Sequence, residues 1–216
     1  MFGGSRHIYE LYRKRTVSEV KKMNRQNKTK MLAVLGVLSA LTAVISFLPI
    51  RTLGLEITLS MVPVALAANL YGPAAGAVLG TVFGTVSFLQ CFSYSPFGTV
   101  LLSINAFYTF LVCVPTRALA GFLSGLTAKA ASKKPRLSAA LGSVAAPVLN
   151  TLFFMSALCL LFYKTDYIQG FVSTLGAANP FMFVVMFVGI NGLIEAVAGA
   201  AIAFPASIAV KKAVKI

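Results

Sequence analysis

A single arginine, Arg117, interrupts a long apolar stretch of this chain. It lies in the segment VPTRALAG (Val114–Gly121), and the nearest charged residues along the chain are Glu56 and Lys129. A charged side chain at the centre of a membrane helix costs about 2.5–3.5 kcal/mol on insertion scales, so a compensating partner is expected. The planar guanidinium of arginine binds anions through paired hydrogen bonds. Arg117 is therefore the first candidate for binding an anionic ligand.

Three more polar residues are expected at a similar depth in the membrane. At about 1.5 Å of rise per residue, Arg117 lies roughly 18 Å from the inner end of its helix at Lys129. Asn150 is midway along the next apolar stretch, and Asn191 and Glu195 lie four residues apart on one face of the last one. These spacings predict a polar site to which three helices contribute.

The pair Arg117 and Glu195 allows two interpretations. One is a buried ion pair that joins two helices, because charges inside membranes commonly pair with each other. The other is a pocket in which Arg117 binds an anionic ligand, and Asn150 and Asn191 at the same level favour it because an ion pair alone does not explain them. For each asparagine taken singly, an interhelical hydrogen bond explains its presence equally well.

Further candidates lie nearer the outer surface. Gln90 ends one apolar stretch, and Asn105 lies in the next. Tyr94 belongs to the aromatic loop CFSYSPFG, and Tyr108 continues the aromatic character beyond it. These aromatic side chains either cap an apolar ligand site or form the interfacial belt of a membrane protein.

The composition indicates which elements position these residues. The chain has 216 residues, of which 58% are hydrophobic and 11% charged, whereas an ordinary soluble domain is about 25% charged. We predict an all-α polytopic membrane protein with six transmembrane helices. The expected helices are residues 30–48, 57–71, 74–90, 99–128, 137–163 and 180–211. Pro115 is expected to kink the fourth helix, and residues 51–56 and 164–179 are expected to form outer loops.

The distribution of positive charge predicts the topology. Nine of the 19 Lys and Arg residues precede Met31, and most of the others lie in 129–136 and 211–215. Such blocks beside apolar stretches place both termini in the cytoplasm and suit an anionic inner leaflet. We therefore predict a basic tail at 1–29, with Met23 as an alternative start, and a transmembrane domain at 30–216. A net charge of +14 in this arrangement argues against a nucleic-acid partner.

Small residues recur on two of the expected helices. On the first helix they are Ala33, Gly36, Ala40 and Ala43. On the third helix they are Gly76, Gly80 and Gly84. Small residues at such spacings share one face and let helix backbones approach closely in lipid. We expect the third helix to use its glycines inside the bundle, whereas the first helix either packs internally or docks on a partner membrane protein.

The chemistry that the chain lacks narrows its function. Its only histidine is His7, its only aspartate is Asp166, and it has no phosphate-binding loop of the type G-x-x-x-x-G-K-[ST]. These absences argue against histidine-based catalysis, a metal site, a cofactor, ATP hydrolysis by this chain and a carboxylate relay for protons or sodium. The expectation is a binding protein for a solute, with no enzymatic activity.

The stretch ITLSMVPVALAANLYGPAAGAVLGTVFGTVSF (Ile57–Phe88) resembles the substrate-binding S components of energy-coupling factor (ECF) transporters. The resemblance rests on a Thr or Ser and a Pro, then a GP turn and a glycine-striped helix, and it extends from about Met31 to the C-terminus. It implies a six-helix vitamin-capturing protein of a bacterial cell membrane. Its implied partners are a transmembrane coupling protein, on which the small face of the first helix docks, and two cytosolic ATPases. Toppling of the S component in the membrane would release the vitamin inward.

The stretches SFLQCFSYSPFGTVLLSINAF, VPTRALAG, LNTLFFM and INGLIE are most similar to pantothenate-type S components. That resemblance implies that Arg117 binds the carboxylate, and that Asn150, Asn191 and Asn105 bind the amide and hydroxyls. Folate is the main rival, whereas uncharged riboflavin leaves Arg117 unexplained. Two alternatives of other classes stay open: a stand-alone carrier or channel for a small organic anion, and a structural subunit in which Arg117 and Glu195 only clamp two helices.

Overall fold

The computed structural model describes residues 28–48, 50–52, 55–57 and 59–214, without the side chains of residues 50–52, 55–57, 190, 191 and 214. The chain divides into a unit that ends at Val37 and a second unit, Leu38–Ile216, and each is described by itself. The helix Lys28–Ser46 crosses this boundary. All but the last two residues of the predicted basic tail lie outside the described residues.

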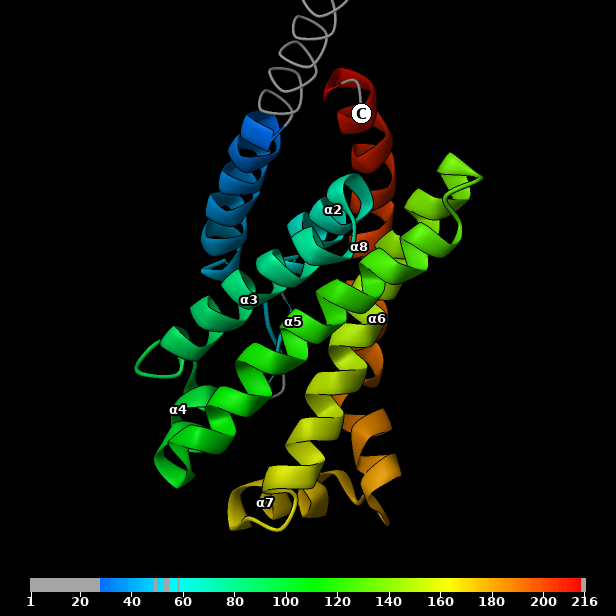
Figure 1. The fold of residues 1–216 in the computed structure, drawn as a ribbon. Helices are drawn as coiled ribbons and strands as arrows, with labels where there is room; N and C mark the ends of the chain where they lie inside the picture. The colour runs from blue at the N-terminus through cyan, green and yellow to red at the C-terminus, as the bar shows by residue number, and fades with distance from the viewer. Residues whose placement is uncertain (1–27, 49, 53–54, 58, 215–216) are drawn as a thin grey trace, which may run out of the picture. The chain divides into compact units, whose positions relative to one another are not determined.

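Short connections link the elements that follow this helix. In chain order (Figure 1) they are β1 (Ile50–Thr52), β2 (Leu55–Ile57), α2 (Met61–Tyr71), α3 (Pro73–Gln90), α4 (Pro96–Ile104), α5 (Ala106–Ala130), α6 (Pro135–Phe162), α7 (Asp166–Leu175) and α8 (Pro180–Val214). The two strands pair antiparallel, with Arg51 opposite Glu56. Gly72, with φ 86°, makes the turn between α2 and α3, and Pro73 opens α3, where its fixed φ suits a first helical turn.

The structure confirms the all-α polytopic fold class. Among the described residues, five helices are long and apolar enough to cross a membrane. A sixth span results if α7 and the first part of α8, bent by 76°, count as one. The predicted second helix, α2, has 11 residues and covers only about half of a hydrocarbon core roughly 30 Å thick. It is buried from Met61 to Leu70 and packs against α3, α5, α6 and α8, so it is a central element of the second unit.

The predicted fourth helix, residues 99–128, is wrong as a single element. The chain breaks at Asn105, whose φ of −159° and ψ of 107° are extended, and α4 and α5 lie on either side. The Asn105 side chain accepts a hydrogen bond from the Tyr108 backbone N–H at 3.0 Å, as an N-cap residue does. Helical structure continues through Pro115, so the break precedes the residue at which a kink was expected.

Two of the predicted outer loops, residues 51–56 and 164–179, contain regular structure. The segment expected as the first loop forms the β1–β2 hairpin, so the following helix begins at Met61 and not near residue 57. The second contains α7, which starts after the N-cap residue Thr165 and is followed by the C-cap residue Gly176, whose φ of 64° is left-handed. Short elements of this kind lack the long apolar periodicity that marks a membrane span.

The glycines of α3 pack against α5, as predicted for internal packing. A Cβ atom added to Gly76 would overlap the Gly121 backbone, and one added to Gly80 would overlap the Arg117 carbonyl oxygen. One added to Gly84 would lie 2.7 Å from the Cys113 carbonyl oxygen, closer than real Cβ atoms come. Three successive glycines therefore set the register between α3 and α5, because each admits the backbone of the facing helix.

The small residues of the first helix belong to both units. Ala40 is exposed and Ala43 is half-buried in the second unit, whereas Ala33 and Gly36 lie in the first. An added Cβ at Gly36 has no neighbour within 4 Å. In the second unit, the face that was predicted to dock on a partner therefore has one accessible small residue, Ala40.

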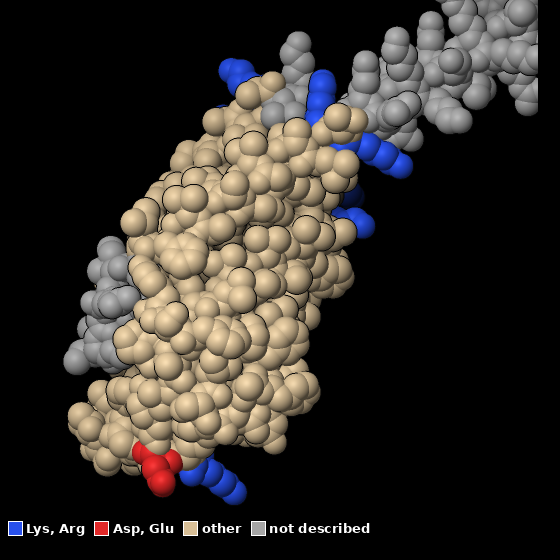
Figure 2. All heavy atoms as spheres, turned by 90° about the vertical axis from the view of Figure 1, so that its left-hand side faces the viewer, with Lys and Arg blue, Asp and Glu red and all other residues tan. Residues whose placement is uncertain are grey.

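Charged side chains group at the two ends of the second unit and are rare between them (Figure 2). One end has the last turn of α5, the start of α6 and the last turn of α8, and its described cations are Lys129, Lys133, Lys134, Arg136, Lys211 and Lys212. The other end has α7 (Figure 1), beside which Lys164 and Asp166 lie exposed. Apolar sides between charged ends are what a multi-pass membrane protein requires.

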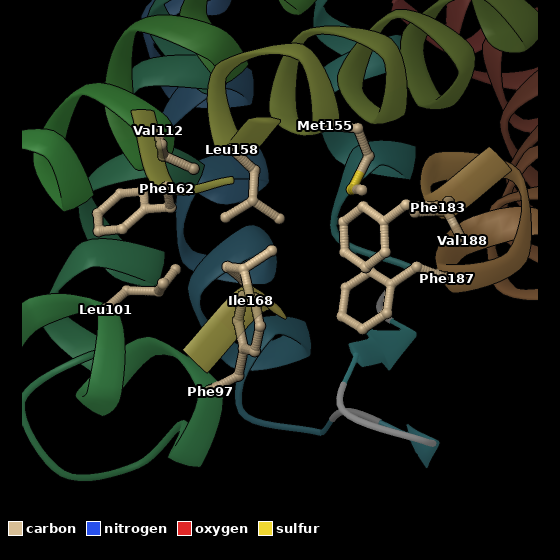
Figure 3. Packing of buried hydrophobic residues seen from close by; sticks show 10 residues of the cluster. All are labelled: Phe97, Leu101, Val112, Met155, Leu158, Phe162, Ile168, Phe183, Phe187 and Val188. Carbon is tan, nitrogen blue, oxygen red and sulfur yellow. The ribbon is translucent and has the colours of Figure 1, made fainter. Parts of the chain in front are cut away.

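A cluster of buried apolar side chains fills the half of the second unit nearer to α7 (Figure 3). Its members are Phe97, Leu101, Val112, Met155, Leu158, Phe162, Ile168, Phe183, Phe187 and Val188. The Phe183 and Phe187 rings stack with centroids 5.0 Å apart. Phe97 joins three elements, because its ring contacts Tyr167 and Phe171 of α7 and Phe187 of α8.

Candidate binding cavity

A cavity of about 130 Å³ lies between α3, α4, α5, α6 and α8. This is roughly ten times the volume that one water molecule needs, so the cavity has room for a small organic molecule. Its polar lining residues are Ser87, Gln90, Ser95, Thr109, Arg117, Asn150, Thr151 and Glu195. Its apolar lining residues are Phe83, Phe97, Leu101, Val112, Phe154, Met155 and Val188. An apolar wall with a few convergent polar groups is typical of small-molecule sites.

Arg117 is buried in the wall of this cavity, with 8% of its surface exposed. Its Nη1 donates hydrogen bonds to the carbonyl oxygens of Cys113 at 3.0 Å and Val112 at 3.3 Å. Its Nε has no hydrogen-bond partner among the described residues. The side chain therefore turns back along its own helix, and part of its donor capacity is left for another molecule.

Two aromatic rings flank the guanidinium of Arg117. Its central carbon lies 4.8 Å from the centroid of the Phe83 ring and 5.2 Å from that of Phe154. Such contacts stabilise a cation by roughly 0.5–2 kcal/mol, which offsets only part of the cost of burying the charge. The rings also hold the guanidinium plane in place, so an anion would meet an arginine that is already oriented.

The position of Arg117 depends on the close packing of α3 and α5. Gly80 lies against the Arg117 carbonyl oxygen, and Gly84 lies against that of Cys113. Phe83 lies between these glycines in sequence, on the same face of α3 as Gly80, which brings its ring to the guanidinium. The glycine stripe thus has a second consequence, because it places the arginine and its aromatic neighbour beside the cavity.

Asn150 provides a second incompletely bonded polar group. It lies on α6, 9% of its surface is exposed, and it lines the same cavity as Arg117. Its Oδ1 is buried and has no hydrogen-bond partner in the part of the chain that the structure describes. A buried acceptor left unbonded costs about 1–3 kcal/mol. A ligand that donates a hydrogen bond to this oxygen would remove that cost.

Glu195 and Gln90 also line the cavity, as the predicted site requires. Glu195 is half-buried on α8. The Gln90 amide nitrogen donates to the Ser46 carbonyl oxygen at 2.7 Å, so this side chain also holds the end of the first helix against α3. Four of the predicted residues (Arg117, Asn150, Glu195 and Gln90) are therefore brought together.

The other four predicted contact residues are placed differently. Asn105 caps α5, Tyr94 donates from its hydroxyl to the Phe47 carbonyl oxygen at 2.7 Å, and Tyr108 packs its ring edge-on against Phe162. None of these three lines the cavity. The helix break explains the first case, because it turns Asn105 from a wall residue into a cap. The Asn191 side chain lies outside the described residues.

Several lining residues escaped the sequence analysis. Ser87, Ser95, Thr109 and Thr151 are hydroxyl residues, which occur throughout membrane helices and commonly bond to carbonyls of their own helix. Thr109 does so, donating to the Asn105 carbonyl oxygen at 2.9 Å. Phe83 could have been found, because it shares a helix face with Gly80 of the glycine stripe. No sequence signal distinguishes Phe154 from its apolar neighbours.

Comparison with known families gives one clear match. The model of the family described as "ECF transporter, substrate-specific component" matches residues 30–207, which is most of the chain and includes every residue that lines the cavity. No curated protein matches the sequence at a significant level. The apolar helices and the cavity are consistent with this family match. We conclude that this chain belongs to the substrate-specific components of ECF transporters.

Proposed function

We propose that this S component captures pantothenate from outside a bacterial cell and passes it to ATP-driven partner subunits. Membership of the family makes the chain a transport subunit that associates with the other parts of an ECF transporter. The identity of the vitamin, and partners consisting of one transmembrane coupling protein and two cytosolic ATPases, belong to the proposal. Its main support is the buried Arg117, whose Nε lacks a partner among the described residues and which lines a small cavity.

The chemistry of pantothenate matches the groups in the cavity. Its carboxylate can accept hydrogen bonds from the guanidinium of Arg117, and charge-assisted bonds of this kind are the strong ones. Its hydroxyls and amide N–H can donate to the unpartnered Oδ1 of Asn150. Its methyl groups suit the apolar side of the wall, which includes Leu101, Val112 and Val188.

The main rival vitamins fit these groups less well. Riboflavin and folate are larger than pantothenate, and the cavity holds about 130 Å³. Riboflavin also lacks a carboxylate and would leave the Arg117 charge uncompensated. Folate carries two carboxylates and a pterin ring, and Arg117 is the only basic side chain in the described cavity lining.

We also propose an orientation in the membrane. The end of the second unit with Lys129–Arg136 and Lys211 would face the cytoplasm, following the positive-inside rule. The end with α4 and α7 (Figure 1) would face outward, and residues of α4 line the cavity. Both termini would then be cytoplasmic. The accessible small face around Ala40 would dock on the coupling protein, because small residues permit close helix contact in lipid.

Calorimetry on the purified full-length chain tests the proposed ligand. We expect saturable binding of pantothenate, and weak or absent binding of riboflavin and folate. Arg117→Ala should remove the binding, whereas Leu119→Ala should not, because Leu119 lies on the same helix with an exposed side chain outside the cavity lining. Unchanged binding by the Arg117→Ala variant, or tight binding of riboflavin or folate alone, contradicts the proposal.

Reconstituted transport separates an ECF subunit from a stand-alone carrier or channel. Vesicles with this chain and its coupling module should accumulate pantothenate only with active ATPases. Uptake by the chain alone at the same rate would instead support the carrier or channel alternative. Copurification of a coupling protein and ATPases with the full-length chain gives an independent check on the partners.

A further inference from the structure

The first turn of α4 forms part of the cavity wall at a distance from Arg117. The N-cap residue Ser95 lines the cavity, and so do Phe97 and Gly98 of the turn itself. Gly98 packs against Cys91, the residue that follows α3, because a Cβ atom added to Gly98 would lie 2.6 Å from the Cys91 sulfur. The ligand contacts described above give this turn no polar role.

This turn has hydrogen-bonding capacity to spare. The Ser95 hydroxyl accepts from the Gly98 N–H at 3.4 Å, and the Ser95 carbonyl oxygen accepts from the Thr99 N–H at 2.8 Å. Pro96 has no N–H, and the Phe97 N–H has no hydrogen-bond partner among the described residues. A serine hydroxyl that accepts one bond can still donate its own proton. The N-terminal end of α4 therefore favours an oxygen atom of a ligand, because free N–H groups and the helix dipole point there.

Two other groups in the same wall indicate that this cavity holds a ligand. Arg117 and Asn150 are each more than nine-tenths buried. Arg117 Nε and Asn150 Oδ1 have no hydrogen-bond partner in the described part of the chain. The cavity thus has a cationic donor at Arg117 and a separate set of neutral donors at the first turn of α4.

Helix packing sets the distance between these two donor sets. Arg117 Nη1 donates to the Cys113 carbonyl oxygen, which lies against Gly84 of α3. Gly98 of α4 lies against Cys91, seven residues beyond Gly84. At about 1.5 Å of rise per residue, the guanidinium and the first turn of α4 are roughly 10 Å apart along the axis of α3.

We propose that pantothenate lies lengthwise in the cavity, with its carboxylate at Arg117 and its primary hydroxyl at the first turn of α4. Eight bonds separate the carboxylate carbon from the primary hydroxyl oxygen, and an extended chain advances about 3.5 Å for every three bonds, so the two groups are about 9 Å apart. The hydroxyl oxygen accepts hydrogen bonds from the Phe97 N–H and from the Ser95 hydroxyl. This orientation rests on the proposed function, and it makes α4 the element that selects carboxylates with a hydroxyl at this distance.

Calorimetry on the full-length chain with two ligands tests this orientation. The ligands are pantothenate and its analogue in which hydrogen replaces the primary hydroxyl. We expect the analogue to bind about tenfold or more weakly, because it leaves the donors of α4 unpaired. Ser95→Ala should weaken pantothenate binding by about tenfold and should not weaken binding of the analogue further. Ser95→Gly should behave alike, and since glycine caps a helix nearly as well as serine, it separates loss of the hydroxyl from loss of the cap.

The matched control is Ser103→Ala. Ser103 lies on the same helix with an exposed side chain outside the cavity lining, so its substitution should leave the affinity for both ligands unchanged. Equal binding of the two ligands by the unsubstituted chain overturns the orientation, and so do Ser95 substitutions that weaken both ligands equally. In either case the proposed function stands if pantothenate binding still depends on Arg117. If pantothenate does not bind the unsubstituted chain at all, the proposed function fails and the orientation fails with it.

Discussion

The second unit contains two buried polar clusters. Protein atoms surround one of them, and the other faces the cavity. The Asn69 cluster joins α2, α6 and α8: the Asn69 amide nitrogen lies 3.2 Å from the Ala139 carbonyl oxygen, 3.1 Å from Ser143 Oγ and 2.9 Å from Ser207 Oγ. None of these four residues lines the cavity. The Arg117 cluster, formed by Arg117 and Asn150, lines the cavity and has an unpartnered atom on each residue among those described.

Packing distinguishes the two clusters, whereas the presence of an unpartnered buried atom does not. The Asn69 Oδ1 also has no partner in the described chain, but it packs against Gly142, where an added Cβ would overlap it. The space around that amide is therefore filled with protein atoms. Arg117 and Asn150 face an open volume instead. We therefore expect a polar group that neighbouring atoms enclose to hold helices together, and one that faces open space to be available to a ligand.

The largest effect on binding is expected for Arg117→Ala. The guanidinium of Arg117 would contribute at least two charge-assisted hydrogen bonds to a carboxylate, each worth about 1.5–3 kcal/mol. Pantothenate affinity should therefore fall by about a hundredfold or more, as measured by calorimetry. The thermal midpoint should not fall, because the substitution removes a buried charge that protein atoms compensate only in part.

Glu195→Ala is the comparison that separates a binding group from an ion-pair clamp. A clamp between Arg117 and Glu195 predicts that both substitutions lower the thermal midpoint to a similar extent. The binding interpretation predicts a loss of affinity for Arg117→Ala without that paired loss of stability. Equal destabilisation together with unchanged pantothenate affinity would place Arg117 in the same class as Asn69.

Gly80→Ala should damage stability and binding together. The added methyl group would overlap the Arg117 carbonyl oxygen, so α3 and α5 must separate, and overpacking of this kind costs about 1–3 kcal/mol. Pantothenate affinity should fall as well, because Phe83 and Arg117 lose their register. Thermal unfolding and calorimetry on the same preparation measure both quantities.

The matched control for Gly80→Ala is Gly142→Ala, because Gly142 lies against Asn69 and not against Arg117. Its added methyl group would overlap Asn69 Oδ1, so a loss of stability without loss of affinity is expected. The comparison between the clusters breaks down if Gly142→Ala weakens pantothenate binding as strongly as Gly80→Ala does.

The sequence alone predicted the class of the fold and four of the eight polar side chains that line the cavity. Long apolar stretches and flanking cations indicate the membrane helices, and a lone Arg117 is conspicuous because its charge is costly there. The helix break at Asn105 was not predictable from periodicity, because α4 and α5 are both apolar and Asn105 differs from Asn150 only in its surroundings. An estimate of depth places residues along a helix, but it does not say which neighbouring helix a side chain meets.

Asn69 also shows that the role of a buried asparagine depends on partners that are distant in the sequence. It lies in the stretch that carries the family resemblance, but its polar partners are two serines more than 70 residues away. A buried asparagine in an apolar helix fits a cap, a clamp or a binding group equally well until its partners are known. The three asparagines 69, 105 and 150 serve in the structure as clamp, cap and cavity wall.

Asn69→Ala should lower stability and leave ligand affinity intact. The substitution removes hydrogen bonds between three elements and leaves Ser143 and the Ala139 carbonyl oxygen with one neighbour fewer, at a cost of about 1–3 kcal/mol. The thermal midpoint should fall, and pantothenate affinity at a temperature well below the midpoint should match that of the unsubstituted chain. A Ser207→Ala variant should show part of the same loss, since its hydroxyl lies 2.9 Å from the Asn69 amide nitrogen.

The smallest of the expected losses of affinity, and the most discriminating result, is expected for Asn150→Ala. Its Oδ1 has no described protein partner to lose, so the substitution removes an unsatisfied buried acceptor and should leave the thermal midpoint of the free protein unchanged or slightly higher. In the complex the same oxygen would accept a hydrogen bond from pantothenate, so affinity should fall by about tenfold. The midpoint gained on adding pantothenate should therefore be smaller for the variant, because a ligand stabilises the folded state according to its affinity. The opposite result, a loss of stability in the free protein with unchanged affinity, would make Asn150 a helix clamp like Asn69 and leave Arg117 as the one member of its cluster bound to the ligand.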